Sequence, residues 1–231
     1  MLDENFHYDN EIYPKLKQIE LIIRPECNQK CEYCYITKHG KELYPFEERL
    51  SKDKILKNLD MLLDFIFNKK QVFIKQWEMF AGDLFYDGLF FDILDVFDKY
   101  YNQVFNKYKS LFLAKQVIIL LPVNTSFSKK EENISKIRKY VNHFKEAYNI
   151  RLILSFSTDG KYAVDTREQN VLNDYDVDAY YDKLFELTNE FYFCFHPMIS
   201  SSNVKNWIKN YDWWIENFNK YYLNHPINKD F

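Results

Sequence analysis

Residues 17–34 read KQIELIIRPECNQKCEYC, and this stretch sets the expectation for the rest of the chain. Residues 17–24 alternate between polar and apolar and then become continuously apolar, as in a strand that is buried on one or both faces. Pro25 ends the pattern, because proline has no N–H to donate to a sheet. We therefore expect a first strand at 17–24 that leads directly into a cysteine-rich loop at 25–36.

The remainder of the chain repeats this alternation of strand and helix. Short apolar runs predict four more strands, and apolar residues at helical spacing predict five helices. The predicted strands are 72–80, 116–121 (closed by Pro122), 151–156 and 191–195, and the predicted helices are 51–69, about 87–105, 129–148, 178–190 and 203–222. Strands that alternate with helices form a parallel sheet through right-handed crossovers, so the expected fold class is α/β.

Length and composition indicate one globular domain. The chain has 231 residues, of which 47% are hydrophobic, so we expect residues 17–231 to form a single folded domain after an N-terminal extension at 1–16. The 4 glycines form no Gly-rich phosphate loop, and the net charge of −3 gives no general attraction for nucleic acid. The sequence shows neither a membrane-spanning apolar run nor a signal peptide, which predicts a cytoplasmic protein without a membrane partner.

Three of the 4 cysteines form the motif C-x3-C-x2-C at Cys27, Cys31 and Cys34. In a reducing compartment, thiols grouped on one short loop favour metal or redox chemistry over disulfides. Thiolates suit an iron–sulfur cluster, in which three ligands leave one iron open, or zinc, which needs a fourth ligand such as His39. The spacing leaves both metals as alternatives. Cys194 lies in an apolar strand and is expected to be an inert core thiol.

Polar residues and glycines follow the other strands, where ligands bind in parallel sheets. Gly82 and Asp83 follow the second predicted strand, and Asn124 follows the third. Ser157 follows the fourth strand in the segment Ser-Thr-Asp-Gly, and Met198 follows the fifth. Each segment is also compatible with an ordinary turn, so the argument for a site rests on their shared position at the ends of successive strands.

In this order, the motifs resemble those of the radical S-adenosylmethionine (radical SAM) enzymes. That family has C-x3-C-x2-C after its first strand, with an aromatic residue before the last cysteine, which is Tyr33 here. It has Gly-Gly-Glu-Pro after the second strand, where this chain has Ala81, Gly82 and Asp83. Its peptide- and protein-modifying branch often has Ser-x-Asp-Gly after the fourth strand and then an arginine, which would be Arg167.

The resemblance implies a parallel partial (β/α)-barrel of the TIM type with about five to six βα units. It implies a [4Fe–4S] cluster on the three loop cysteines and S-adenosylmethionine on the open iron. The cofactor contacts would come from Tyr33, Gly82, Asp83, Asn124, Ser157, Arg167 and Met198. The reaction would use an external one-electron reductant and remove a hydrogen atom from a peptide or protein substrate.

The chain also departs from the family. It lacks the C-terminal domain that holds auxiliary clusters in many peptide-modifying members, and only five βα units are counted. A fragment, a minimal open barrel and a partner chain that completes the barrel are all compatible with this count. Two other functions stay open from the sequence, namely a zinc-binding structural or regulatory domain and a family member that keeps the fold without catalysis.

Overall fold

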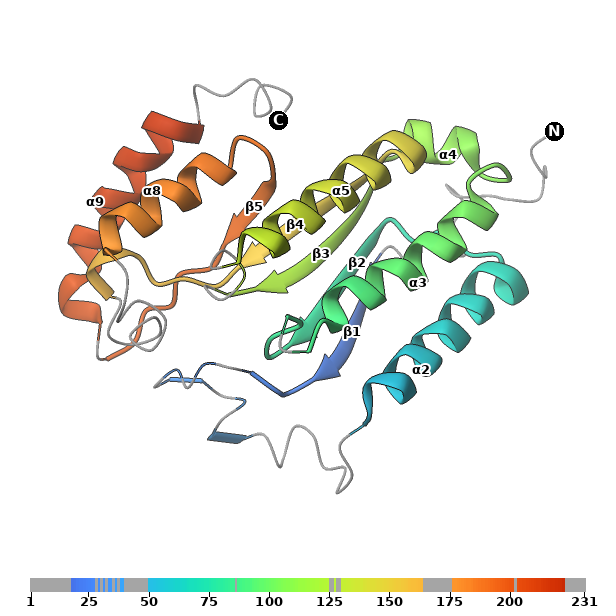
Figure 1. The fold of residues 1–231 in the computed structure, drawn as a ribbon, viewed down its shortest axis with the longest axis horizontal. Coiled ribbons are helices and arrows are strands. Elements are labelled where there is room, and N and C mark those ends of the chain that lie inside the picture. The colour runs from blue at the N-terminus through green and yellow to red at the C-terminus, as the bar shows by residue number, and fades with distance from the viewer. Residues whose placement is uncertain are drawn as a thin grey trace.

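The computed structural model describes residues 18–27, 29, 31, 33–34, 36, 38–39, 50–85, 87–124, 127, 130–163, 176–201 and 203–222. Within these residues the fold is α/β, as predicted, with a sheet of five parallel strands in the sequential order β1-β2-β3-β4-β5 (Figure 1). The strands are β1 (Gln18–Arg24), β2 (Gln76–Ala81), β3 (Val117–Val123), β4 (Ile150–Phe156) and β5 (Tyr192–Phe195).

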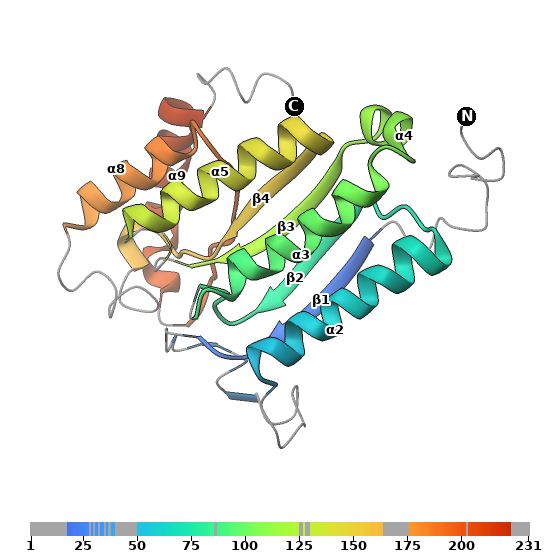
Figure 2. The same ribbon diagram turned by 45° about the vertical axis from the view of Figure 1, so that its right-hand side comes forward.

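Helices connect the strands and also follow the last strand. They are α2 (Lys52–Asp64) with a π-helical extension η2 (Phe65–Lys70), α3 (Leu89–Val104), α4 (Lys109–Ala114), α5 (Glu131–Tyr148), η4 (Lys161–Ala163), α8 (Val177–Leu187), η5 (Val204–Asn206), α9 (Trp207–Asn217) and η6 (Phe218–Tyr222). Helices α2, α3 and α5 lie side by side on one face of the sheet in both views (Figures 1 and 2). Right-handed crossovers between sequentially ordered strands place their helices on the same face.

Local sequence signals account for the starts of several helices. The hydroxyl of Ser51 accepts the N–H of Lys54 at the start of α2, and the carboxylate of Asp176 accepts the N–H of Asp178 at the start of α8. The apolar stripes of these helices meet an aromatic core. At its centre, the fully buried indole of Trp77 donates a hydrogen bond of 2.7 Å to the hydroxyl of Tyr101.

The central strands bury one face fully and the other only in part. In both β3 and β4, every second side chain is buried, beginning with Val117 and Ile150, while the side chains between them are half-buried. The buried side faces the helices, and the other side is only partly covered within the described residues. None of the described helices is long and apolar enough to cross a membrane.

The structure differs from the sequence prediction most clearly at β3, β2 and α4. Strand β3 continues through Pro122 to Val123, whereas we expected Pro122 to end it. Val123 accepts the N–H of Ser157 beyond β4, so Pro122 faces the β2 side, where pairing stops at Leu120 and no N–H is required. Strand β2 begins at Gln76, later than the predicted residue 72, and α4 is a helix that the periodicity did not predict.

Candidate functional site

The cysteine loop begins at β1 and is held first by the loop that follows β2. The N–H of Gly82 donates to the carbonyl of Arg24 at 3.0 Å, and the N–H of Asp83 donates to the carbonyl of Glu26 at 2.7 Å. These bonds continue the ladder between β1 and β2 past the ends of both strands. They bring the Gly-Asp segment next to the residue that precedes Cys27.

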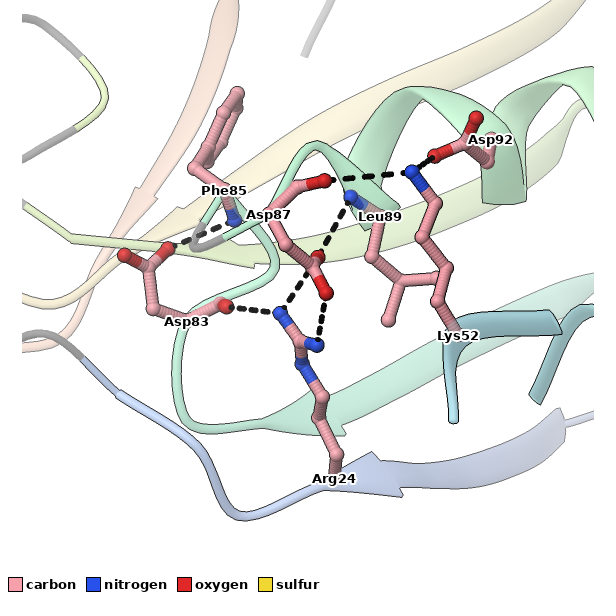
Figure 3. Close-up of polar contacts among 7 residues, drawn as sticks. All are labelled: Arg24, Lys52, Asp83, Phe85, Asp87, Leu89 and Asp92. Atoms are coloured by element: carbon pink, nitrogen blue, oxygen red, sulfur yellow. Dashed lines mark hydrogen bonds and ion pairs between the residues drawn. The ribbon is translucent and has the colours of Figure 1, made fainter. Parts of the chain in front are cut away.

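Gly82 has no room for a side chain. A Cβ atom there would lie 2.2 Å from the carbonyl oxygen of Glu26 and 2.5 Å from that of Pro25. The need for glycine at position 82 is therefore explained within the chain itself, by contact with the cysteine loop. Asp83 is 2% exposed, and its carboxylate accepts the N–H of Phe85 at 2.9 Å, which shapes the turn after β2 (Figure 3).

A partly buried ion pair between Arg24 and Asp87 supports the same turn. The guanidinium of Arg24 makes two hydrogen bonds with the carboxylate of Asp87, and one of its nitrogens also lies 3.4 Å from the carbonyl oxygen of Asp83 (Figure 3). Burial raises the pKa of Asp87, but the hydrogen bond and charge of Arg24 outweigh it, with help from the N–H of Leu89 and the charge of Lys52, so the pKa is lowered.

The three loop cysteines form no disulfide bond and are partly buried. The sulfur of Cys27 accepts the N–H of Gln29 at 3.4 Å and the side-chain amide of Asn124 at 3.7 Å, and such donors stabilise negative charge on sulfur. The N–H of Cys34 donates to the carbonyl of Cys31 at 3.1 Å, so a tight turn joins the second and third cysteines. Among the described side chains, no three His, Cys, Asp or Glu residues are gathered as a metal-binding group.

The far end of the cysteine loop reaches the loop after β4. The hydroxyl of Tyr33 donates to the carboxylate of Asp159, which is fully buried. The other oxygen of that carboxylate accepts the N–H of Met198, beyond β5, at 2.9 Å. The structure therefore brings Tyr33 and Met198, two residues that the sequence singled out, to one side chain. The cysteine loop thus has contacts beyond β2, β3 and β4.

Sequence reasoning missed two buried asparagines that complete this region. The amide of Asn210 donates to the carbonyl of Asp159 at 2.6 Å and accepts the N–H of Tyr162 at 2.9 Å. Asn203 bridges the N–H of Ser200 and the carbonyl of Met198. A signal was available only for Asn210, which lies between Trp207 and Trp213 in an aromatic segment, where a short amide is needed only if backbone groups must be satisfied.

The other predicted site residues have more ordinary surroundings. Asn124 is buried beside Cys27, as its contact with that sulfur shows. Ser157 is half-buried, and its N–H continues the pairing of β4 with β3. Met198 is 46% exposed at the side chain, so its backbone is the part that is tied into the site. Arg167 lies outside the described residues.

A cavity of about 500 Å³ lies between β5 and α9. Most of its lining is aromatic, and it includes Phe195, Trp207 and Trp214. Cys194 also lines the cavity and is exposed, so the prediction that it is a buried core thiol was wrong. Phe193, the neighbour before it, takes the buried side of the strand, and the alternation of β5 turns Cys194 to the opposite side.

Comparison with known proteins adds no assignment: no family model matches the chain, and neither a curated protein nor a solved structure matches it.

Proposed function

We propose that this protein is a radical SAM enzyme that binds a [4Fe–4S] cluster through Cys27, Cys31 and Cys34 and acts on a peptide or protein substrate. The observation that supports it most is the path of the cysteine loop. The loop leaves β1 and has contacts beyond β2, β3 and β4, through Asp83, Asn124 and Asp159. Ligand sites of parallel α/β folds lie at this edge of the sheet.

The fold and the donor set are compatible with the proposal. A sequential parallel sheet with neighbouring helices on one face is the arrangement expected of a partial TIM-type barrel that is open between β5 and β1. The three thiols are soft ligands on one loop, they form no disulfide bond, and each is partly exposed. These features fit a cluster that keeps one iron open for S-adenosylmethionine.

With both cofactors bound, the chemistry supplied is one-electron reductive cleavage of S-adenosylmethionine to methionine and a 5′-deoxyadenosyl radical, which removes a hydrogen atom from the substrate. The chain would provide binding and orientation. The amide of Asn124 and the N–H of Gln29 would stabilise charge on the sulfur of Cys27. The segment around Gly82 and Asp83 would border the cofactor, with Ser157, Arg167 and the backbone at Met198 toward its nucleoside end.

Anaerobic reconstitution with iron and sulfide tests the cluster. We expect about four iron atoms per chain and a brown chromophore. Cys31→Ala should lose both, whereas Cys194→Ala should retain them, because Cys194 lies on β5 and outside the loop. A tightly bound zinc ion with no iron-dependent absorbance would instead establish the zinc-binding alternative.

Cofactor cleavage tests the activity separately. The reconstituted chain, given dithionite and S-adenosylmethionine, should release 5′-deoxyadenosine, and Cys31→Ala should release none. A chain that holds the cluster but yields no 5′-deoxyadenosine would be the non-catalytic relative that the sequence left open.

A further inference from the structure

We propose that Asp159 is a positioning residue that fixes the cysteine loop over the sheet by accepting the hydroxyl of Tyr33. The inference rests on the proposed function in one respect, namely that the loop is the metal-binding segment. It assigns to Asp159 a task that is distinct from contact with any cofactor.

The contact spans the sheet. Tyr33 belongs to the loop that leaves β1, and Asp159 follows β4, so the contacting residues are separated by 126 positions in sequence and by β2 and β3 in the sheet. The entry of the loop is held by the backbone bonds to Gly82 and Asp83. Tyr33 directly precedes Cys34, so its hydroxyl holds the end of the loop that carries the last cysteine.

Asp159 is itself fixed before it accepts that hydroxyl. Its side chain is fully buried, one carboxylate oxygen accepts the N–H of Met198, and its carbonyl accepts the amide of Asn210. A buried carboxyl group has lost its hydration, so each hydrogen bond that it accepts matters more than one at the surface. The loop is therefore anchored to a residue that is held by the segment after β5 and by α9.

The consequence can be measured through metal affinity. Without the Tyr33 hydroxyl, the loop samples more positions in the absence of metal. The entropy lost when the loop becomes ordered then opposes metal binding. We expect the affinity of the loop for a metal ion to fall about 3- to 10-fold, the value of one hydrogen bond. The ligand set should not change, because the three thiols remain.

The experiment is a titration of the full-length apoprotein with Co²⁺, followed by thiolate-to-cobalt charge-transfer absorption. Tyr33→Phe should weaken binding by the factor above, and the absorbance per bound Co²⁺ at saturation should equal that of the parent. Tyr140→Phe is the matched control, since it removes a hydroxyl that donates to Asp95 between α5 and α3, away from the loop. Its affinity for Co²⁺ should stay at the parent value.

A double-mutant cycle identifies the partner. Asp159→Ala should weaken Co²⁺ binding, and the Tyr33→Phe/Asp159→Ala double variant should be no weaker than Asp159→Ala alone. Asp159→Asn keeps hydrogen-bonding groups at both positions and should restore the affinity to within about 2-fold of the parent. Tyr33→Phe removes one oxygen atom from a partly exposed ring. The titration of this variant therefore still tests the proposal if Asp159→Ala does not fold.

The outcomes separate this inference from the proposed function. Parent affinity in Tyr33→Phe, additive losses in the double variant, or a parent chain that binds no Co²⁺ would each overturn it. Co²⁺ binding requires neither iron, sulfide nor S-adenosylmethionine. The predicted Co²⁺ pattern in a chain that forms no iron–sulfur cluster would therefore support the positioning role and reject the proposed function.

Discussion

The guanidinium of Arg24 contacts both carboxylate oxygens of Asp87, with N–O distances of 2.7 and 2.9 Å. Arg24 ends β1 and Asp87 precedes α3, so the pair fastens the exit of the first strand to the helix that follows the second. One of the two oxygens also accepts the N–H of Leu89, at 3.2 Å, which satisfies a free donor in the first turn of α3.

Removing the guanidinium should therefore destabilise the fold. The two side chains are 9% and 37% exposed, which places the pair between buried and surface ion pairs. We expect Arg24→Met to lower the free energy of unfolding by about 1–3 kcal/mol, as measured by urea denaturation. Lys99→Met, which breaks an exposed pair with Asp60, is the control and should lower the free energy of unfolding less than Arg24→Met does. Equal losses would contradict the role given to Arg24.

The same pair should make stability depend on pH. The pKa of Asp87 in the folded chain lies below its ordinary value of 3.8, so the stabilisation is complete above that value and is lost as the pH falls through the folded pKa. The difference in unfolding free energy between the parent and Asp87→Asn should be constant near neutral pH and should shrink below pH 3.8. Urea denaturation at a series of pH values measures it, and a difference that does not change with pH would contradict it.

Gly82→Ala should displace the cysteine loop, because its Cβ would meet two backbone carbonyls at 2.2 and 2.5 Å. We expect a loss of about 1–3 kcal/mol in unfolding free energy, and weaker Co²⁺ binding. Gly88→Ala is the comparison. Gly88 has a φ of +77° but open space, its nearest contact being Lys52 Nζ at 3.9 Å. The Gly88→Ala variant should lose about 1 kcal/mol in unfolding free energy and keep the parent Co²⁺ affinity. Equal effects on Co²⁺ binding would argue against the steric explanation.

Asn210→Ala should lower the free energy of unfolding by more than the loss of a small side chain usually does. The change leaves the carbonyl of Asp159 and the N–H of Tyr162 without the amide that satisfies them. A loss of about 1–3 kcal/mol is expected in thermal or urea unfolding. Asn217→Ala, which removes an amide donor to the carbonyl of Trp213 four residues earlier on α9, should change stability by less than about 0.5 kcal/mol. A result in the reverse order would show that Asn210 does not hold the turn.

The thiol of Cys194 should react slowly at neutral pH. Partial burial, together with the negative charge of Glu78, raises its pKa above the ordinary value of 9.0. In a chain with the three loop cysteines replaced by serine, the iodoacetamide rate should still be rising beyond pH 9.0. Glu78→Gln should shift the profile to lower pH. Mass spectrometry of the modified peptide gives the rates, and a plateau reached below pH 9.0 would be inconsistent with the raised pKa.

The strands, most helices and the position of the cysteine loop could be predicted from local sequence, because burial and helical spacing repeat within short windows. The end of β3 could not, since whether Pro122 is tolerated depends on which neighbour its missing N–H would face. The side of the sheet on which Cys194 lies was also missed. A four-residue strand of apolar residues does not reveal which of its faces the helices cover.

The candidate site was predictable only in part, for a related reason. The sequence predicted a shared site for residues past successive strand ends, and the structure joins two of these residues, Tyr33 and Met198, through Asp159. The bridging roles of Asp159 and Asn210 depend on partners 126 and 51 residues away, which no local pattern contains. The sequence therefore indicates where the candidate site lies. The hydrogen bonds within that site could be identified only from the tertiary structure.

The long separation of Tyr33 and Asp159 has a consequence for biosynthesis. During translation, the three cysteines leave the ribosome well before the residue that would anchor their loop has been made. At ordinary elongation rates, the intervening 126 residues take roughly 6 to 25 seconds to synthesise. Over that interval the thiols have no completed sheet edge beneath them. If the chain binds metal as proposed, ordered binding would follow only after the fourth strand has joined the sheet.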